Sequence, residues 1–461
     1  MSTLAFPPVF AGRRFAVMGL GRNGLPTAEA LVAMGAEVSA WDDDGASRDT
    51  ASRHGIHLAN PLAGMLAVDA LILSPGIPHI FPAPHPVAAR AAEQGIPILS
   101  DAELLFQAVR AAGSRAGFIG ITGTNGKSTT TALIAHILKT AGVSFAAGGN
   151  LGPAALALPL LPDAGYYVLE MSSYMLERIS ELRFEIATLL NLSPDHLDRH
   201  GGMEGYIAAK KRIFAQRTPQ GLAVIGIDDQ LSCEIAASLA PPLARISGES
   251  AADVWCESGT LCDRIGPILA MHEASALPGT HNAQNAAAAA AVALAAGVAR
   301  PALAAAIRSY PGLPHRQQSI CRIGGIEFIN DSKATNADSV ARALACYPRV
   351  VWIAGGIAKE GGIESLERFF PRLAEALLIG RDAPLFAATL ARCGVPYRIV
   401  GRLEDAVPAA YEAARARSVP VVLLSPAAAS FDQFQGFPER GERFAGLARA
   451  LATRPQEGRA A

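Results

Sequence analysis

A phosphate-binding loop between a strand and a helix is the feature that most restricts the fold of this chain. The segment "FIGITGTNGKSTT" (118–130) begins as an apolar strand, passes through the loop "TGTNGKST" and enters the amphipathic stretch "STTTALIAHILKTAG". The common motif is GxxxxGK[ST]. Gly126, Lys127 and Ser128 fit it, whereas Ile121 stands at the first glycine position. Such a loop and the following helix N-terminus cradle phosphate oxygens. The residues expected to contact them are Gly123, Thr124, Asn125, Gly126, Lys127, Ser128 and Thr129.

Strand-length apolar runs alternate with helical stretches along the whole chain, which predicts an α/β protein with mainly parallel sheets. A chain of 461 residues is too long for one ordinary core. The pattern restarts after "RAAGSRAG" (110–117) and after "YPGLPHRQQ" (310–318). We therefore expect three domains at 1–113, 114–314 and 315–461. The first and last are expected to be Rossmann-like, and the central one to hold the phosphate loop.

Composition excludes several classes of partner. The 40 Lys and Arg against 41 Asp and Glu leave a net charge of −1, so no overall field favours nucleic acid or an anionic membrane. Six scattered cysteines form no CxxC pair, which indicates neither zinc nor disulfides and favours the cytoplasm. No export signal is expected. The alanine-rich run 283–299 predicts a buried helix and no membrane insertion.

Polar residues follow further apolar strands. Glu170 ends "GYYVLE", where a second metal ligand is needed near bound phosphates; taken alone, it is equally a solvated strand end. His196 follows the strand in "ATLLNLSPDHLDRHGG", and Lys210 lies in the helical "EGYIAAKKRIF". Taken alone, the pattern predicts that His196 is a helix-capping or core residue and that Lys210 is a surface lysine.

The first domain contains "GLGRNG", a complete GxGxxG from Gly19 through Gly21 to Gly24, with Asp42 at the end of the next strand. This pattern alone predicts a dinucleotide such as NAD.

Taken in order, "TGTNGKST", "LEMSS", "NLSPDHLDRH" and "AAKKRIF" resemble the Mur ligases, the ATP-dependent amino-acid-adding enzymes of peptidoglycan synthesis. The similarity continues in "GTHNAQNAAAA", "LPHR" and "FINDSKATN", so it extends over nearly the whole chain. "SPGI" and "SPAAASFDQF" are similar to the branch that adds D-glutamate to UDP-N-acetylmuramoyl-L-alanine. The resemblance implies that ATP phosphorylates a carboxylate and that an amine then displaces the phosphate.

The resemblance also implies roles for individual residues. Lys127, Glu170, His196 and Lys210 become the catalytic set, with magnesium held by Ser128, Glu170, His196 and Lys210. Lys210 matches a lysine that the family carbamylates with carbon dioxide. Only the neutral amine reacts, so a site that lowers its pKa would help.

The binding residues implied by the resemblance fall into three groups. For the adenosine part of ATP they are Asn282, Asn285, Arg316 and Asp331, although Asn285 is equally a helix-capping residue. For the GxGxxG domain, the resemblance implies the uridine diphosphate substrate as the ligand in place of NAD. Its expected contacts are Arg22, Asn23, Asp42, Gly76 and Asn150. For D-glutamate they are Lys333, Thr335, Lys359, Ser430, Phe431 and Phe437, although Lys359 is equally a solvated loop residue.

Three positions depart from the family pattern: Met175 replaces a frequent glutamine, Ile357 a common acidic residue and Ala428 a frequent cysteine. These changes leave the phosphate and metal groups intact and affect mainly the expected amino-acid selectivity. L-glutamate as the substrate, a folylpolyglutamate synthetase, an NAD-dependent dehydrogenase and a non-catalytic nucleotide sensor are the alternatives. A monomer is expected, closing about a hinge near Pro314.

Overall fold

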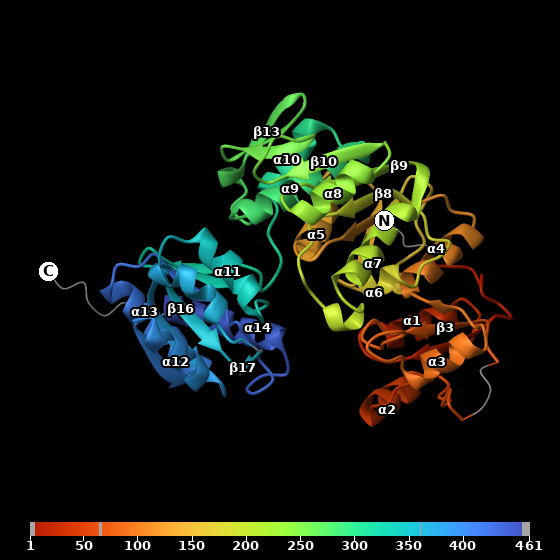
Figure 1. Ribbon diagram of the computed structural model, residues 1–461, viewed down its shortest axis with the longest axis horizontal. Helices are drawn as coiled ribbons and strands as arrows, with labels where there is room; N and C mark the ends of the chain where they lie inside the picture. Colours follow the sequence, from red (N-terminus) through yellow and green to blue (C-terminus); the bar gives the residue numbers. More distant parts are fainter. Residues whose placement is uncertain (1–4, 64–66, 360, 454–461) are drawn as a thin grey trace. The chain divides into compact units, whose positions relative to one another are not determined.

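The computed structural model describes residues 5–63, 67–359 and 361–453. The chain forms two compact units (Figure 1). The first runs to Ala274 and also includes Thr280–Tyr310; the second comprises Ser275–Gly279 and the chain from Pro311 onward.

The first unit contains a four-stranded parallel sheet with the order β2-β1-β3-β4. Its strands are β1 (Arg14–Met18), β2 (Glu37–Trp41), β3 (Ala70–Leu73) and β4 (Ile98–Leu99). A helix follows each strand in turn: α1 (Gly24–Ala33), α2 (Gly45–Arg53), α3 (Pro86–Glu93) and α4 (Asp101–Ala111). Pro86 begins α3, and the Ser100 hydroxyl caps α4 by accepting from Glu103 N, as helix starts favour.

A nine-stranded sheet in the same unit has the order β13-β12-β11-β10-β9-β8-β5-β7-β6. Its strands are β5 (Gly117–Thr122), β6 (Phe145–Gly149), β7 (Tyr166–Glu170), β8 (Phe184–Leu189), β9 (Arg217–Gly226), β10 (Leu243–Ser247), β11 (Val254–Glu257), β12 (Thr260–Asp263) and β13 (Gly266–Ala270). Only the pairings of β12 with its neighbours β11 and β13 are antiparallel. The helices are α5 (Lys127–Thr140), α6 (Ser173–Leu176), α7 (Met203–Ala215), α8 (Gln230–Ser238), α9 (Thr280–Ala295) and α10 (Arg300–Arg308).

The central strands of this sheet end at one edge. Ile121 on β5 is in register with Glu170 on β7, and Thr122 is in register with Leu189 on β8. All six residues of β5 are buried, because helices cover both faces of a parallel sheet. The loops that leave these three strands therefore bring the phosphate loop, Glu170 and the His196 segment to the same edge.

The second unit is built on a six-stranded sheet with the order β14-β15-β20-β16-β18-β19. Its strands are β14 (Gln318–Ile323), β15 (Ile326–Asn330), β16 (Val350–Gly355), β18 (Leu373–Ile379), β19 (Tyr397–Gly401) and β20 (Val421–Leu424), and a separate pair joins β17 (Ile357–Ala358) to β21 (Ala428–Ala429). The helices are α11 (Ala337–Cys346), α12 (Ala383–Arg392), α13 (Leu403–Ala416) and α14 (Phe437–Thr453). Consecutive residues of β16, Val351 and Trp352, belong to different apolar clusters. Because neighbouring strand residues point to opposite faces, both faces of the sheet are covered.

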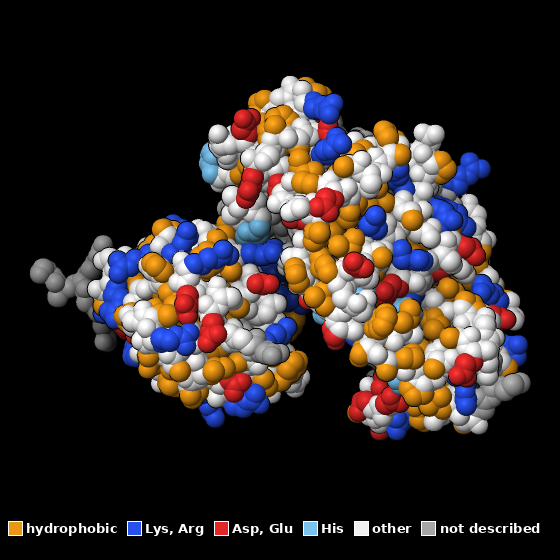
Figure 2. Space-filling model, in the orientation of Figure 1, with side chains coloured by type: hydrophobic (Ala, Val, Ile, Leu, Met, Phe, Trp, Pro, Cys, Tyr) orange, Lys and Arg blue, Asp and Glu red, His pale blue; other side chains and the backbone are white. Residues whose placement is uncertain are grey.

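The predicted fold class, an α/β protein with mostly parallel sheets, is confirmed. The alanine-rich run lies largely in α9, where residues 282–293 are buried. Among the helices of the described residues, none combines the length and the apolar character needed to cross a bilayer. On the face seen in Figure 2, basic and acidic side chains are interspersed over each unit. The boundaries between the three expected domains remain a prediction.

Candidate functional site

The phosphate loop is folded around its own lysine. Lys127, the first residue of α5, donates from Nζ to the carbonyl oxygens of Gly123 and Thr124 at 2.8 Å each. Gly126, which precedes the helix, has φ +86°, and a Cβ there would lie 2.2 Å from Asn285 Oδ1. Only glycine adopts this conformation in so little space. The loop therefore has a compact cradle shape, and in the predicted role Lys127 would leave these carbonyls to reach phosphate oxygens.

Asn191 holds this loop from the neighbouring strand. Its Oδ1 accepts from Asn125 N at 2.9 Å, and its Nδ2 donates to Asn125 O at 3.2 Å and to Gln284 Oε1 at 3.0 Å. Sequence reasoning missed both Asn191 and Gln284. The available signal was the position of Asn191, two residues past β8, because polar residues just beyond parallel strands gather at one edge.

Glu170 offers a cation a carboxylate oxygen. The side chain is 2% exposed. Its Oε1 accepts from Asn150 Nδ2 at 2.7 Å, whereas Oε2 is buried and has no hydrogen-bond partner among the described residues. A buried carboxylate oxygen without a partner is costly, and a divalent cation that prefers oxygen ligands would compensate it. Glu170 therefore fits the magnesium role expected of it.

Lys210 is buried beneath the phosphate loop. The residue is 2% exposed, and its Nζ donates to Gly123 O at 2.8 Å and to Thr122 Oγ1 at 3.3 Å. The Tyr206 ring lies 4.8 Å from the ammonium nitrogen. Burial, assisted by the positive charge of Lys127, lowers the pKa of Lys210 well below its ordinary value. This environment favours the neutral amine.

His196 lies in the loop after β8 and is half exposed, at 55% of its side chain. Its Nε2 is 3.5 Å from Asp195 Oδ2, and its ring centroid is 5.6 Å from that of Tyr174. Partial burial lowers the pKa of His196 despite the Asp195 charge, and Lys127 lowers it further. The imidazole is accordingly available as a neutral ligand near the phosphate loop.

Within the described residues, no three His, Cys, Asp or Glu side chains gather as a preformed metal site. Magnesium bound here would therefore take much of its coordination from nucleotide oxygens and water, as this ion usually does. Ser128, which is 8% exposed at the start of α5, is the other protein oxygen of the loop expected to contribute.

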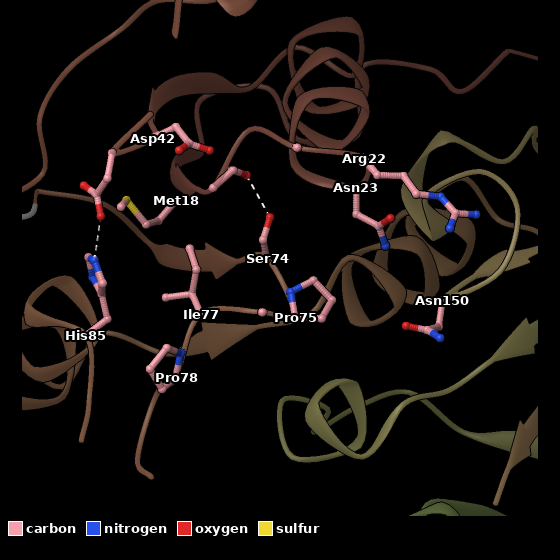
Figure 3. A pocket seen from close by; sticks show the side chains of 14 residues that line it. Met18, Arg22, Asn23, Asp42, Ser74, Pro75, Ile77, Pro78, His85 and Asn150 are labelled. Atoms are coloured by element: carbon pink, nitrogen blue, oxygen red, sulfur yellow. Dashed lines mark hydrogen bonds and ion pairs between the residues drawn. The ribbon is translucent and has the colours of Figure 1, made fainter. Parts of the chain in front are cut away.

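A pocket of about 450 Å³ lies at the carboxyl edge of the four-stranded sheet (Figure 3). All five residues predicted to contact the uridine diphosphate substrate line it: Arg22, Asn23, Asp42, Gly76 and Asn150. Asp42 accepts from Leu20 N at 2.6 Å and from Asp44 N at 2.9 Å, so its carboxylate fixes the glycine-rich turn.

Two of these residues also donate to backbone oxygens at the end of β6 and in the loop that follows it. Arg22 donates to Gly152 O at 3.0 Å, and Asn23 donates to Gly149 O at 3.3 Å. Asn150 lines the pocket and hydrogen-bonds Glu170. One asparagine thus joins the pocket to the carboxylate beside the phosphate loop.

The asparagines expected at adenine pack against the phosphate loop. Asn285 is 2% exposed, accepts from Thr130 Oγ1 at 3.2 Å and donates to Asn282 Oδ1 at 3.0 Å. Both of its side-chain polar atoms are thus occupied within the protein. Asn282 is 7% exposed at the start of α9. Their contact with adenine remains a prediction.

The remaining predicted nucleotide residues belong to the second unit. Asp331 follows β15, accepts from Ser425 Oγ at 2.7 Å and from Gln317 N at 3.2 Å, and is buried. Burial raises its pKa to about 7 although the hydrogen bonds and Arg316 oppose the shift. Arg316 lies on the same loop as Gln317, within the charge field of Asp331.

Three of the predicted D-glutamate residues directly follow β17 or β21: Lys359, Ser430 and Phe431. The Lys333 ammonium lies 4.0 Å from the centre of the Phe437 ring, and Thr335 N donates to Lys333 O at 2.9 Å. Lys359 directly follows β17 and is exposed. Ser430, which follows β21, is 2% exposed, whereas Phe431 is 70% exposed. Their amino-acid contacts remain predictions.

The chain has detectable relatives among known proteins. The family model described as "Mur ligase middle domain" matches residues 121–293. UDP-N-acetylmuramoylalanine–D-glutamate ligase from Paramagnetospirillum magneticum is 49% identical, with 96% of this chain and 98% of that protein covered. The protein of the same name from Rhodospirillum rubrum is 47% identical, with 96% of both chains covered.

Solved structures agree in fold. UDP-N-acetylmuramate–alanine ligase from Thermotoga maritima superposes with a TM-score of 0.60 at 17% identity, covering 95% of this chain and 100% of that one. UDP-N-acetylmuramoylalanyl-D-glutamyl-2,6-diaminopimelate–D-alanyl-D-alanyl ligase from Acinetobacter baumannii gives a TM-score of 0.56 at 19% identity, covering 78% and 86%.

Proposed function

The chain belongs to the Mur ligase family, among its UDP-N-acetylmuramoylalanine–D-glutamate ligases, and on this basis we propose that it joins D-glutamate to UDP-N-acetylmuramoyl-L-alanine. A carboxylate oxygen of the L-alanyl group attacks the γ-phosphorus of ATP, and the bond to ADP breaks. The D-glutamate amine then attacks the acyl phosphate carbon, loses a proton and expels phosphate. The products are an amide, ADP and phosphate.

The observation that best supports this reaction is the double role of Asn150. It lines the 450 Å³ pocket proposed for the uridine diphosphate part, and its amide holds Glu170 beside the phosphate loop. A substrate anchored in that pocket can extend past Asn150 toward the γ-phosphate. Holding the two reactants in this way lowers the barrier by fixing their approach.

Lys127, Ser128 and Glu170 are the residues that we assign to the phosphate and magnesium groups. Lys127 moves from the Gly123 and Thr124 carbonyls to the outer phosphates. Ser128 and the Oε2 of Glu170, which has no hydrogen-bond partner within the described part of the chain, would hold magnesium. The bound cation would neutralise charge that develops on the transferred phosphoryl group. His196 would help to hold a second magnesium at the acyl phosphate, as the family resemblance implies.

We further propose that Lys210 reacts with carbon dioxide to form a carbamate. Nitrogen bonds to the carbon, the amine loses a proton, and an anion replaces the neutral amine. The lowered pKa of Lys210 favours this reaction at neutral pH. The carbamate would place negative charge beside Lys127, whose positive charge disfavours the ammonium form, and could contribute to magnesium binding.

The other predicted residues complete the assignment. Asn282 and Asn285 bind adenine, and Arg316 and Asp331 close over the nucleotide. Lys333, Thr335, Lys359, Ser430, Phe431 and Phe437 receive D-glutamate, because ammonium groups and hydroxyls suit a dicarboxylate. We propose a monomer, since one chain supplies every assigned residue. The six cysteines are all free, which suits a reducing cytoplasm.

Phosphate release tests the proposal. Protein with ATP, magnesium and UDP-N-acetylmuramoyl-L-alanine should release phosphate only when D-glutamate is added. Equal turnover with L-glutamate would contradict the amino-acid assignment alone. Phosphate release that never depends on an amino acid would contradict the ligase reaction.

A further inference from the structure

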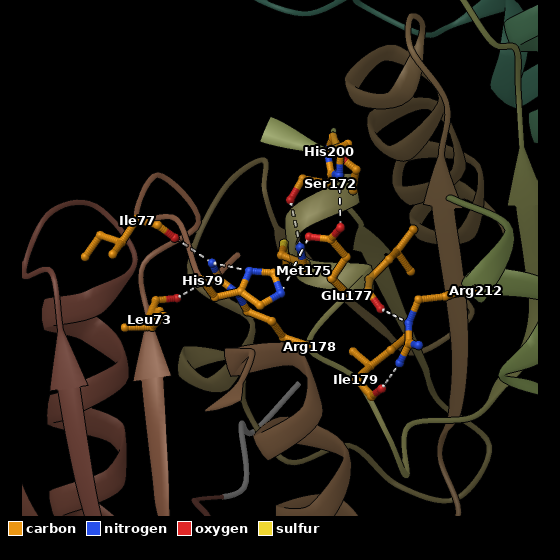
Figure 4. A network of polar contacts seen from close by, with 12 residues as sticks. Leu73, Ile77, His79, Ser172, Met175, Glu177, Arg178, Ile179, His200 and Arg212 are labelled. Carbon is orange, nitrogen blue, oxygen red and sulfur yellow. Dashed lines mark hydrogen bonds and ion pairs between the residues drawn. The ribbon is translucent and has the colours of Figure 1, made fainter. Parts of the chain in front are cut away.

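Arg178 holds the wall of the uridine diphosphate pocket from outside. Its side chain is 3% exposed, and its guanidinium donates to Leu73 O at 2.9 Å and to Ile77 O at 2.6 Å (Figure 4). Residues 74–78 line the pocket. Arg178 itself lies just after α6, in the segment that leaves Glu170. A side chain from the reaction-centre segment thus fixes the backbone of the distant pocket.

His79 and Glu177 extend this contact. Arg178 Nη2 lies 3.4 Å from His79 Nδ1, and His79 Nε2 lies 3.8 Å from Glu177 Oε2. Burial and the nearby guanidiniums of Arg178 and Arg199 lower the pKa of His79 to about 4, so its ring is neutral at pH 7. A neutral ring with Nδ1 facing a guanidinium carries its proton on Nε2, toward Glu177.

His200 completes the connection. Its side chain has no exposure; Nδ1 lies 2.9 Å from Glu177 Oε1, and Nε2 lies 2.9 Å from Ser173 Oγ. The ring stacks on Tyr174 with a 10° interplanar angle and a centroid distance of 5.3 Å. His200 is four residues beyond His196, and Ser173 is three residues beyond Glu170. The network therefore ties together the two segments that carry these groups.

We propose that Arg178, His79, Glu177 and His200 form a positioning network through which filling of the uridine diphosphate pocket orders the segments that carry Glu170 and His196. None of the four side chains needs to touch the reacting atoms. A continuous chain of polar contacts can transmit such a restraint; here Arg178 and His200 are buried, whereas His79 and Glu177 are partly exposed and form an ion-pair contact at 3.8 Å. Binding energy from a remote part of a substrate can then orient the reaction centre. The inference rests on the proposed function for the identity of the pocket's ligand.

Hydrogen exchange with uridine diphosphate as the probe tests the network. In the wild-type chain, the ligand should slow exchange in residues 19–24 and also in residues 173–180, the latter by about fivefold or more. Glu177→Gln should keep the first response and lose the second. Glu181→Gln is the matched control, because Glu181 is exposed in the same segment, and it should behave like the wild type.

Glu177→Gln removes the carboxylate that faces buried Arg178, so a second variant is needed in case this one does not fold. His200→Phe keeps a ring to stack on Tyr174 and removes both hydrogen bonds, and it should lose the same response. A wild-type response in residues 19–24 without one in 173–180, or an unchanged response in both variants, would overturn the network alone. If exchange in residues 19–24 of the wild type does not slow, uridine diphosphate does not bind in the pocket, and both the proposed ligand and the network are contradicted.

Discussion

Asn191 and Asn125 are joined by two hydrogen bonds, from Asn125 N to Asn191 Oδ1 at 2.9 Å and from Asn191 Nδ2 to Asn125 O at 3.2 Å. The side-chain amide acts on the backbone of the phosphate loop as a neighbouring strand would. The loop is therefore held in its cradle shape before any nucleotide binds, which lowers the cost of ordering it on binding.

Asn191→Ala should consequently weaken ATP binding. Two net hydrogen bonds contribute about 1–3 kcal/mol, so the Kd for ATP should rise roughly 10-fold. Titration of ATP by calorimetry measures this change. Uridine diphosphate binding is the internal control and should be unaffected, because Asn191 does not line that pocket. An unchanged ATP affinity would mean that the loop keeps its shape without this restraint.

Lys210→Ala should abolish most phosphate release, by about 100-fold or more if the carbamate stabilises charge as other preorganised groups do. Short carboxylic acids should restore part of the activity, because they can occupy the space of the missing carbamate. Lys211→Ala is the matched control: Lys211 is the adjacent residue on α7 and is exposed. Full activity of Lys210→Ala would remove the carbamate from the mechanism.

The position of the site could be predicted because its main signals are local. Gly126, Lys127 and Ser128 are adjacent in the sequence, and Glu170 ends a recognisable apolar strand. The residues around the glycine-rich turn were also predictable, and Arg22, Asn23 and Asp42 all line the pocket.

The supporting residues could not be predicted, because their partners depend on which elements become neighbours. Asn191 reaches Asn125 only because β8 lies beside β5. Arg178 reaches Leu73 across 105 residues of chain. Asn285 was predicted from the family resemblance to bind adenine, and its packing against Gly126 and Thr130 depends equally on tertiary structure.

Glu170→Gln should raise the stability of the ligand-free protein and lower its activity. Among the described residues, the buried Oε2 of Glu170 has no hydrogen-bond partner. A neutral amide costs less to bury at this position than a charged carboxylate, so the variant should gain roughly 1 kcal/mol of unfolding free energy in the absence of ligand. Loss of the carboxylate should lower phosphate release by about 100-fold and raise the magnesium concentration that gives half-maximal activity. Denaturant unfolding and a magnesium titration measure the two effects. Normal magnesium dependence in the variant would contradict the metal assignment.

Gly24→Ala and Gly21→Ala should differ sharply although both lie in the same GxGxxG motif. A Cβ on Gly24 would lie 1.7 Å from Gly19 O, whereas a Cβ on Gly21 would meet no atom within 4 Å. Gly24→Ala should thus destabilise the first unit by about 3 kcal/mol, the range of severe steric changes. Gly21→Ala should keep its stability and lose uridine diphosphate affinity, since Gly21 lines the pocket. Equal melting temperatures for both variants would contradict the close contact.

Asp331→Asn should alter how the stability of the second unit depends on pH. Burial raises the pKa of Asp331 to about 7 from an ordinary 3.8. The folded state therefore binds more protons than the unfolded chain between these values, and the Asp331 contribution to stability falls as the pH rises to about 7. The amide that replaces the carboxyl group cannot ionise, so any loss of hydrogen bonds in the variant is independent of pH. Relative to the wild type, the variant should gain about 3 kcal/mol between roughly pH 5 and pH 8.

Trp352 is a natural probe for this measurement, because its Nε1 donates to Ser425 O and Ser425 Oγ donates to Asp331. Urea unfolding would be followed by its fluorescence, with Trp41 and Trp255 of the first unit replaced by phenylalanine in both proteins. Other ionisable groups contribute equally to the unfolding free energies of the wild type and the variant, so their contributions cancel in the difference. A difference in unfolding free energy that stays constant with pH would show that Asp331 ionises at its ordinary pKa and that its hydrogen bonds fully compensate for its burial.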